Sequence, residues 1–131
     1  MKVKDLMVTN LITVDARKSL EYALNLMHEH GIRRLPVLEG NMLLGIIVQH
    51  DIEIALRRPE VIPETPVEWV MTKSPLVTAP DAELADAVEL LVAHKISALP
   101  VMESGKLVGI LSEIDVLKLL ADLLRKLEEP N

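Results

Sequence analysis

The sequence between residues 99 and 115 reads LPVMESGKLVGILSEID. Two apolar runs flank Ser104-Gly105, a dipeptide that suits a tight hairpin turn with a residue at positive φ. Ser112 and Asp115 have the three-residue spacing of a helix cap, and a further apolar run follows them. The stretch therefore predicts a strand, a turn, a second strand and the start of a helix.

The same pattern occurs earlier in the chain, as LPVLEGNMLLGIIVQHD at residues 35–51. Matching residues lie 64 positions apart, among them the pairs Pro36/Pro100, Gly45/Gly109 and Asp51/Asp115. One offset fits without a gap from Val3/Val67 to Leu56/Leu120. The chain is therefore an internal duplication of two repeats.

Each repeat has an opening helix with a Met, an extended segment, a helix, an I-x-x-L-P-V run, a hairpin and a G-I-x-x-x-x-D motif. This order resembles the cystathionine β-synthase (CBS) domain, and two copies in tandem resemble a Bateman module. The resemblance covers about residues 2–58 and 66–121. It implies an α+β fold, in which two pseudo-symmetric β-α-β-β-α repeats pack through their small sheets and leave two clefts related by an approximate twofold axis.

The domain organisation follows from the repeat. We expect a first CBS repeat over 1–58, a linker over 59–65, a second CBS repeat over 66–121 and a C-terminal helix extension over 122–131. The linker and its flanks contain three prolines, which prevent a helix from continuing. Each half has about 55 residues, close to the lower limit for burying a core alone. Two halves packed together are therefore expected rather than two independent domains.

Hydrophobic periodicity predicts the secondary structure within each repeat. Ser19 suits the N-cap of the first long helix, and Gly31 suits its left-handed C-terminal position. The expected elements are a short helix at 3–7, an extended run at 11–14, a helix from 20, strands at 34–39 and 42–48, a helix at 49–57, a short helix at 66–71, an extended run at 76–78, a helix at 83–95, strands at 98–103 and 106–112, and a helix from 113.

Composition excludes several classes of protein. Half of the residues are apolar, yet there is no Phe, one Trp and one Tyr, which argues against aromatic platforms for single-stranded nucleic acid. The net charge of −6 divides into +1 for residues 1–58 and −7 for the rest, and an acidic chain disfavours binding to a phosphate backbone. The absence of Cys, of a signal-peptide pattern and of a membrane-length apolar run leads us to expect a cytoplasmic protein without membrane or nucleic-acid partners.

The last helix carries an apolar stripe beyond the end of the repeat. The stripe consists of Leu117, Leu120, Leu124 and Leu127, and it is widened by Leu119 and Leu123. One interpretation is a dimerisation surface, which would make the protein a homodimer. The alternative is ordinary packing against the first repeat.

Ser112 and Asp115 are the first candidate site residues. A Ser-x-x-Asp pair can act as a capping box in which each side chain satisfies a backbone N–H. The first repeat has Val48 and Asp51 at these positions, so its aspartate is kept without a capping partner. The CBS resemblance implies that the aspartates contact the ribose hydroxyls of an adenine nucleotide, as a carboxylate can. It also implies that Ser112 contacts the sugar or phosphate, and so the two clefts are expected to be unequal.

The resemblance implies a second contact region, in which backbone groups hold the adenine between aliphatic walls. In the first repeat it comprises Thr13, Val14, Ile32, Arg33 and Arg34; in the second it comprises Thr78, Ala79, Ile96, Ser97 and Ala98. The two arginines either bind phosphate or form a solvated pair on a surface strand.

Other ligand chemistry has weaker support. His50 precedes Asp51 and is expected near a ligand. The histidines do not have the spacing of a helical metal pair, so no metal site is expected. No phosphate-binding glycine loop or nucleophile elbow occurs, and we expect neither an enzyme nor a catalytic cofactor.

Taken with the resemblance, these patterns predict a regulatory module that binds AMP, ADP, ATP or S-adenosylmethionine in clefts between the repeats. An effector protein in trans would receive the signal, because the sequence contains no effector domain. The alternative is a dimeric scaffold with degenerate clefts, which the substitutions at Val48 and Ser97-Ala98 favour.

Overall fold

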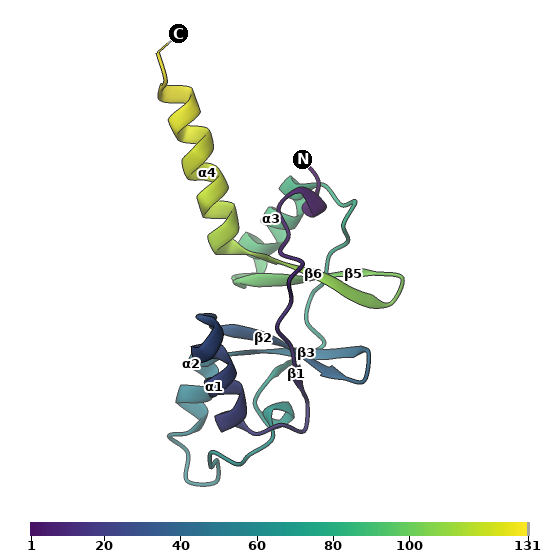
Figure 1. Cartoon of the computed structure of the whole chain (residues 1–131), viewed down its shortest axis with the longest axis vertical. Coiled ribbons are helices and arrows are strands. Elements are labelled where there is room, and N and C mark those ends of the chain that lie inside the picture. The colour runs from purple at the N-terminus through teal and green to yellow at the C-terminus, as the bar shows by residue number, and fades with distance from the viewer. Residues whose placement is uncertain (131) are drawn as a thin grey trace. The chain divides into compact units, whose positions relative to one another are not determined.

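The computed structural model describes residues 1–130, which form two compact units (Figure 1). One unit is the continuous stretch 12–75, which we call the inserted unit. The other combines residues 1–11 with the chain from Leu76 onward, and we call it the split unit. Both contain helices and a small sheet, so the expected α+β class is confirmed.

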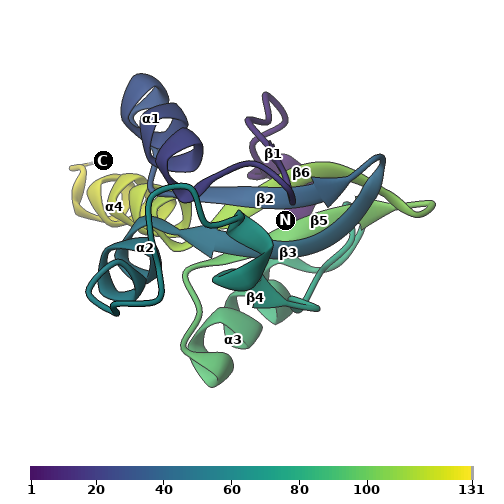
Figure 2. The same ribbon diagram turned by 90° about the horizontal axis from the view of Figure 1, so that it is seen from below.

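The inserted unit is built on a four-stranded sheet in the order β1-β2-β3-β4. Its elements are β1 (Val14–Asp15), α1 (Leu20–His30), β2 (Arg34–Glu39), β3 (Met42–Val48), α2 (Gln49–Ala55), the 3-10 helix η2 (Val67–Trp69) and β4 (Thr72–Lys73). β1 is parallel to β2, whereas β2 and β3, and β3 and β4, are antiparallel. Figures 1 and 2 show α1 and α2 at the end of the β2–β3 hairpin that lies away from its turn.

The split unit repeats this plan with shorter pairings. Its elements are the 3-10 helix η1 (Val3–Asp5), α3 (Leu84–His94), β5 (Ala98–Glu103), β6 (Lys106–Ser112) and α4 (Glu113–Glu128). Single bridges flank the β5–β6 hairpin, a parallel one between Thr78 and Val101 and an antiparallel one between Val8 and Ile110. These bridges stand 64 positions from pairs in β1–β2 and β3–β4, so the two units have the same topology.

The opening segment of each repeat packs in the unit formed by the other repeat. Val3 is fully buried in the core of the split unit, and its N–H donates to the Ala82 carbonyl at 3.0 Å. Val67 is fully buried in the core of the inserted unit, and its N–H donates to the Lys18 carbonyl at 2.8 Å. The compact units are therefore offset from the sequence repeats, because residues 1–11 and 66–75 are exchanged.

Two glycines permit this exchange. A Cβ on Gly45 would overlap the Thr72 carbonyl oxygen and lie 2.8 Å from the Met71 sulfur. A Cβ on Gly109 would lie 2.8 Å from the Met7 sulfur and 3.1 Å from the Val8 carbonyl oxygen. Each glycine thus provides the close approach that an exchanged segment needs beside the hairpin.

Most of the expected elements are present, with shorter ends. Ser19 caps α1 through Tyr22, and Gly31 ends it at φ 63°. The hairpin turn at Ser104-Gly105 is predicted to hold a residue at positive φ, and in the structure both residues adopt it. The short helices at 3–7 and 66–71 are three-residue 3-10 turns, α2 ends at Ala55 rather than at 57, and the run at 76–78 contributes only the Thr78 bridge. These segments pair over too few residues to form longer elements.

Candidate functional site

Ser112 and Asp115 meet where β6 passes into α4 in the split unit. Ser112 is 3% exposed, and its hydroxyl donates to the Asp115 carboxylate at 2.7 Å. The same hydroxyl accepts from the Asp115 backbone N–H at 3.4 Å, which is a long contact. The serine therefore acts as the N-cap, but the expected reciprocal box is incomplete, because the Asp115 side chain binds the hydroxyl instead of a backbone N–H.

The half-buried Asp115 carboxylate retains free capacity. Within residues 1–130, the Ser112 hydroxyl is its only hydrogen-bond partner, and it engages Oδ2. A carboxylate has about four acceptor positions, so Oδ1 remains available to a ligand donor. The first turn of α4 also carries Glu113, which makes the local charge negative. The arrangement suits neutral hydroxyl donors better than a phosphate.

Backbone contacts gather the other second-repeat candidates around this pair. The Glu113 N–H donates to the Ser97 carbonyl at 2.9 Å, and Ala98 is the ladder partner of Ser112. Ile96 and Ser97 are half-buried and directly precede β5. The structure therefore brings Ile96, Ser97 and Ala98 to the start of α4.

Thr78 and Ala79 lie further along the same hairpin. The Thr78 N–H donates to the Pro100 carbonyl, and the Met102 N–H donates to the Thr78 carbonyl, both at 2.9 Å. Thr78 is half-buried and Ala79 is exposed. Thr78 pairs with Val101, three residues beyond Ala98, a separation of about 10 Å along a strand. These two residues therefore lie beside the hairpin but apart from the Ser112–Asp115 pair.

The first-repeat candidates have the same backbone frame in the inserted unit. The Gln49 N–H donates to the Arg33 carbonyl at 2.8 Å, Arg34 pairs with Val48, and Val14 pairs with Val37. Val48 stands at the N-cap of α2 without a side-chain cap. Asp51 is half-buried and makes no side-chain hydrogen bond within the described part of the chain. The carboxylate therefore occupies an equivalent place without the hydroxyl that orients Asp115.

The two arginines of the first repeat differ. Arg33 is exposed, as a solvated residue would be, and His50 is exposed beside Asp51. Arg34 is half-buried, and its Nε is the one buried side-chain polar atom in residues 1–130 that has no hydrogen-bond partner. A buried donor without a partner is costly, which sets Arg34 apart from a surface arginine. Thr13 and Ile32 are half-buried in the same unit.

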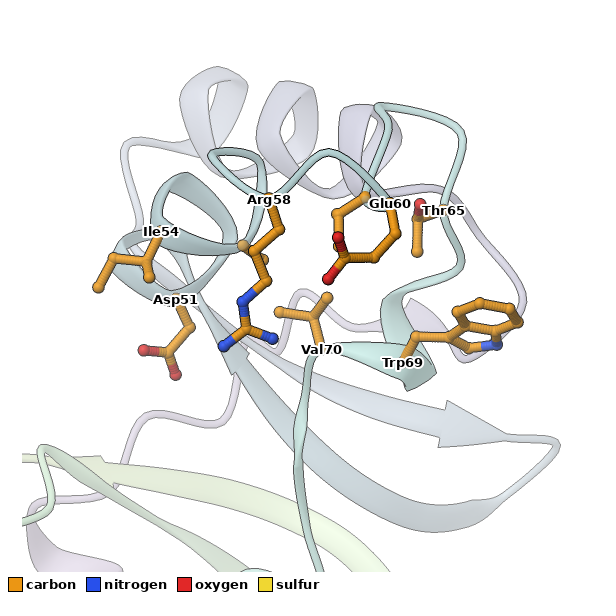
Figure 3. A pocket seen from close by; sticks show the side chains of 9 residues that line it. Asp51, Ile54, Arg58, Glu60, Thr65, Trp69 and Val70 are labelled. Atoms are coloured by element: carbon orange, nitrogen blue, oxygen red, sulfur yellow. The ribbon is translucent and has the colours of Figure 1, made fainter.

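The sequence did not indicate a pocket that the linker forms in the inserted unit. Figure 3 shows this pocket, whose volume is about 340 Å³. Its lining comes from α2, the linker and η2, and consists of Asp51, Ile54, Ala55, Arg58, Glu60, Val61, Thr65, Trp69 and Val70. The only features of the sequence that point to this pocket are the charged residues next to the prolines and the single Trp. The pocket forms because the linker folds back beside α2 and η2, and local sequence patterns do not predict such a path.

The apolar stripe of α4 is exposed. Figure 1 shows this helix extending away from the β5–β6 hairpin, and none of its residues is buried. Val116 and Leu119 pack against the core of the split unit, whereas Leu117, Leu120, Leu123, Leu124 and Leu127 are each between 45% and 81% exposed. The leucines that continue past the second repeat therefore form an unpartnered face.

Two further properties bear on the site. No helix in residues 1–130 combines the length and the apolar character that crossing a membrane requires. The described residues also contain no cluster of three or more His, Asp or Glu side chains placed to hold a metal ion.

Comparison with known proteins adds a family match. The family model described as CBS domain matches residues 3–58 and 67–122. The chain is 34% identical over 116 residues to an inosine-5'-monophosphate dehydrogenase of Korarchaeum cryptofilum. That match covers 88% of this chain but only 23% of the relative, so the chain spans about a quarter of that protein.

Two solved structures resemble the chain over nearly their whole length. The CBS domain pair of protein MJ0100, in complex with 5′-methylthioadenosine and S-adenosyl-L-methionine, is 26% identical, with a TM-score of 0.86. The match covers 94% of this chain and 98% of that one. CBSX2 in complex with AMP is 30% identical, with a TM-score of 0.81 and the same coverage of both chains.

Proposed function

The chain belongs to the CBS domain family, and from that premise we propose that it is a regulatory module that binds an adenosine-type ligand. The ligands named for the two solved relatives are AMP, 5′-methylthioadenosine and S-adenosylmethionine. They share an adenosine moiety but differ in the group attached to the ribose. Recognition of the adenosine part is therefore the common requirement that this chain would have to meet.

One observation carries the proposal, the Ser112–Asp115 pair at the start of α4. The serine hydroxyl holds Oδ2 of the carboxylate at 2.7 Å and leaves Oδ1 available. A cis-diol offers two neighbouring O–H donors that one oriented carboxylate can accept. Hydrogen bonds to a charged acceptor are also the stronger kind, so this pair suits a ribose. Asp115 would bind the sugar hydroxyls and Ser112 would orient it.

The remaining candidates take supporting roles in the proposal. Backbone groups of Ile96, Ser97 and Ala98, with Thr78 and Ala79, would contact the base in the second repeat. The first repeat would offer Asp51 for a second sugar, with Thr13, Val14 and Ile32 for its base. Arg33, Arg34 and His50 would bind phosphate, and the unpartnered Nε of Arg34 supports that role. The first-repeat set lacks a cap hydroxyl, so it would be the weaker site.

Regulation would follow from population shift. A ligand changes a conformational equilibrium only by its difference in affinity for the two states. We propose that the change is transmitted to an effector protein in trans. No role as an enzyme is proposed, because members of this family typically act as regulatory modules without catalytic activity of their own.

A second candidate function is a dimeric scaffold, and the exposed face of α4 favours it. Leu120, Leu124 and Leu127 lie on one side of a helix without a buried residue. We propose that a second copy covers this face and that the protein is a homodimer. Removing residues 122–131 would then convert the dimer to a monomer in sedimentation experiments while leaving the affinity for ligand intact.

Calorimetric titration with AMP, ADP, ATP and S-adenosylmethionine tests the main proposal. We expect binding by the wild type and a loss of roughly tenfold or more in Asp115→Ala, because a charge-assisted hydrogen bond is removed. Asp122→Ala is the matched control, since it removes the same charge from an exposed position on the same helix. Absence of heat with all four ligands, in protein freed of carried-over nucleotide, would favour the scaffold.

A further inference from the structure

The linker pocket of the inserted unit brings opposite charges together without pairing them. Asp51 and Glu60 contribute carboxylates, and Arg58 contributes a guanidinium. The ion pairs within residues 1–130 join Lys2 to Glu83 and Lys4 to Asp81, so none involves the pocket. Its hydrogen-bonding charges are therefore free to bind a ligand.

Figure 3 shows how these groups are distributed along the pocket. Asp51 and Ile54 lie at one end and Trp69 at the other, while Arg58 and Glu60 extend toward the middle, near Val70. Trp69 is 75% exposed, an unusual degree for the largest apolar side chain of the molecule. The pocket thus combines a charged centre with an apolar, partly open end.

The walls of the pocket are held by backbone hydrogen bonds. The Thr65 carbonyl accepts from the Leu20 N–H at 2.9 Å, and the Pro63 carbonyl accepts from the Glu21 N–H at 3.0 Å. The Thr65 hydroxyl accepts from the Ile62 N–H at 3.0 Å, and Thr65 is 7% exposed. The linker is therefore fastened to the start of α1, and the pocket is preformed.

Most of the residues that line this pocket are of a different type at the matching positions 64 residues away. Position 69 corresponds to Asp5, and the α2 residues that line the pocket correspond to Asp115 and Lys118 onward in a helix that continues without a linker. The pocket therefore does not belong to the duplicated frame, and its chemistry has to be derived from its own residues.

The charges of the lining discriminate among ligand classes. The lining carries one positive and two negative groups, so a polyphosphate would meet net repulsion. Arg58 and Glu60 are both exposed, so water can hydrate either group, and a simple carboxylate or a simple amine would engage only one of them. A molecule with both an ammonium and a carboxylate group on the same carbon atom can engage both residues at once.

We propose that this pocket is a binding site for a free α-amino acid with an apolar side chain. Arg58 binds the carboxylate of the amino acid and Glu60 binds its ammonium group. The side chain of the amino acid packs toward Trp69 and Val70. A volume of about 340 Å³ accommodates a molecule of this size and lies near the lower end of the range for small-molecule pockets, about 300–1,000 Å³.

Trp69 provides a direct signal, since it is the only tryptophan of the chain. The test is to titrate the full chain with leucine, methionine and phenylalanine while recording tryptophan emission, and to confirm binding by calorimetry. Isocaproate and isoamylamine, which are leucine without its ammonium group and leucine without its carboxylate, are the matched ligands with a single charge. We expect saturable binding of at least one amino acid and at least tenfold weaker binding of both single-charge analogues.

Variants connect the binding to the two charged residues. We expect Arg58→Gln and Glu60→Gln each to weaken binding by about tenfold or more, while Arg57→Gln and Glu64→Gln, two exposed neighbours outside the pocket, leave it unchanged. Thermal unfolding of each variant verifies that it is folded. No saturation by any of the three amino acids, or equal binding of a single-charge analogue, would overturn the proposal. Asp115→Ala tests the second-repeat site, which shares no residue with the pocket, so that site and the amino-acid site can fail independently; Asp51 is common to the pocket and to the proposed first-repeat site.

Discussion

The two units of the molecule share a frame but differ at the helix that follows each hairpin. In both units, the first N–H of that helix donates to a carbonyl just before the hairpin, Ser97 in one and Arg33 in the other. The split unit has a serine cap and a helix of 16 residues, whereas the inserted unit has Val48 and a helix of 7 residues. The two units have therefore kept the same backbone hydrogen bond at the start of this helix, while the side chain at the N-cap has diverged.

The length difference has a local cause. Pro59 follows α2 and cannot continue a helix, so the chain turns back as the linker and forms the pocket. The corresponding position in the split unit is Leu123, and α4 continues to Glu128. This single difference, Pro59 in the inserted unit and Leu123 in the split unit, accounts for the linker pocket in the first and for the long apolar helix face in the second.

We expect the largest effect on folding when a fragment is made from a sequence repeat instead of from a compact unit. A fragment of residues 1–58 lacks Val67, Val70 and Met71, which pack in the core of the inserted unit. We expect it to remain unfolded, while a fragment of residues 12–75 gives dispersed amide resonances and cooperative unfolding. Equal order in the two fragments would contradict the exchange of opening segments.

The hairpin glycines provide the next comparison. Alanine at Gly45 meets a backbone carbonyl that cannot rotate away, whereas alanine at Gly109 first meets the flexible end of Met7. We expect Gly45→Ala to lower the free energy of unfolding by about 2–3 kcal/mol and Gly109→Ala by about 1 kcal/mol. Urea denaturation measures both, and the reverse order would show that the segment around Met71 adjusts more readily than that around Met7.

Exchanging the cap residues tests the divergence directly. Ser112→Val removes the cap of α4 and should cost about 1 kcal/mol, since loss of an N-cap typically costs 0.5–2 kcal/mol. Val48→Ser should stabilise α2 by a smaller amount and, under the proposed function, strengthen ligand binding by the inserted unit. Denaturation and calorimetry on the two variants and their double mutant measure both effects. Weaker ligand binding by Val48→Ser would oppose a ligand role for this position.

The smallest effect concerns ion pairs that fasten the exchanged segment of the split unit. Lys2 pairs with Glu83 and Lys4 with Asp81. Hydrogen bonds to the lysines hold the pKa values of both carboxyl groups below their ordinary range, and the same bonds raise the pKa values of the lysines. The inserted unit has Arg17 and Glu68 at two of these positions, with the charges reversed.

The pH dependence of these pairs follows from the directions of the shifts. The carboxylates contribute stability above their unfolded-state pKa values and lose it as pH falls through the lowered folded-state values. The lysines lose their contribution as pH rises through folded-state values above 10.5. We expect Lys2→Gln with Lys4→Gln to lower Tm slightly at neutral pH. That difference should vanish once the pH has fallen below the lowered folded-state pKa values of the carboxyl groups, because the pairs are then neutralised, and in 1 M salt, because exposed pairs are screened. A difference that persists in acid would point to packing of the lysine stems.

Much of the fold could be predicted from the sequence because its signals are local. The 64-residue offset located both hairpins, and Ser19 and Gly31 have local roles as caps of α1. Lys95 shows the limit of such signals, since it adopts the left-handed conformation that glycine adopts at the matching Gly31. The Lys95 N–H donates to the Val92 carbonyl at 3.3 Å, so this residue ends α3 as Gly31 ends α1, although a residue other than glycine seldom adopts this conformation.

The candidate site was less accessible to sequence reasoning. Ser112 and Asp115 are neighbours on one turn, so their contact could be anticipated, although its direction differs from the reciprocal box. The exchange of residues 1–11 and 66–75 depends on contacts between distant segments, as does the pocket around Arg58 and Trp69. Neither leaves a periodic signal in the chain.

The exchange of opening segments also bears on how such a chain could arise. A single repeat of this length would have carried a segment that its own core cannot use, and it would have lacked the segment that its core requires. Two separate copies could complete one another only by swapping these arms between molecules. Duplication placed donor and acceptor on one polypeptide, where the effective concentration of each arm is set by a short tether rather than by expression level. Each core was then completed by a segment of the same molecule. The two repeats could diverge afterwards, as they have at Val48 and Ser112.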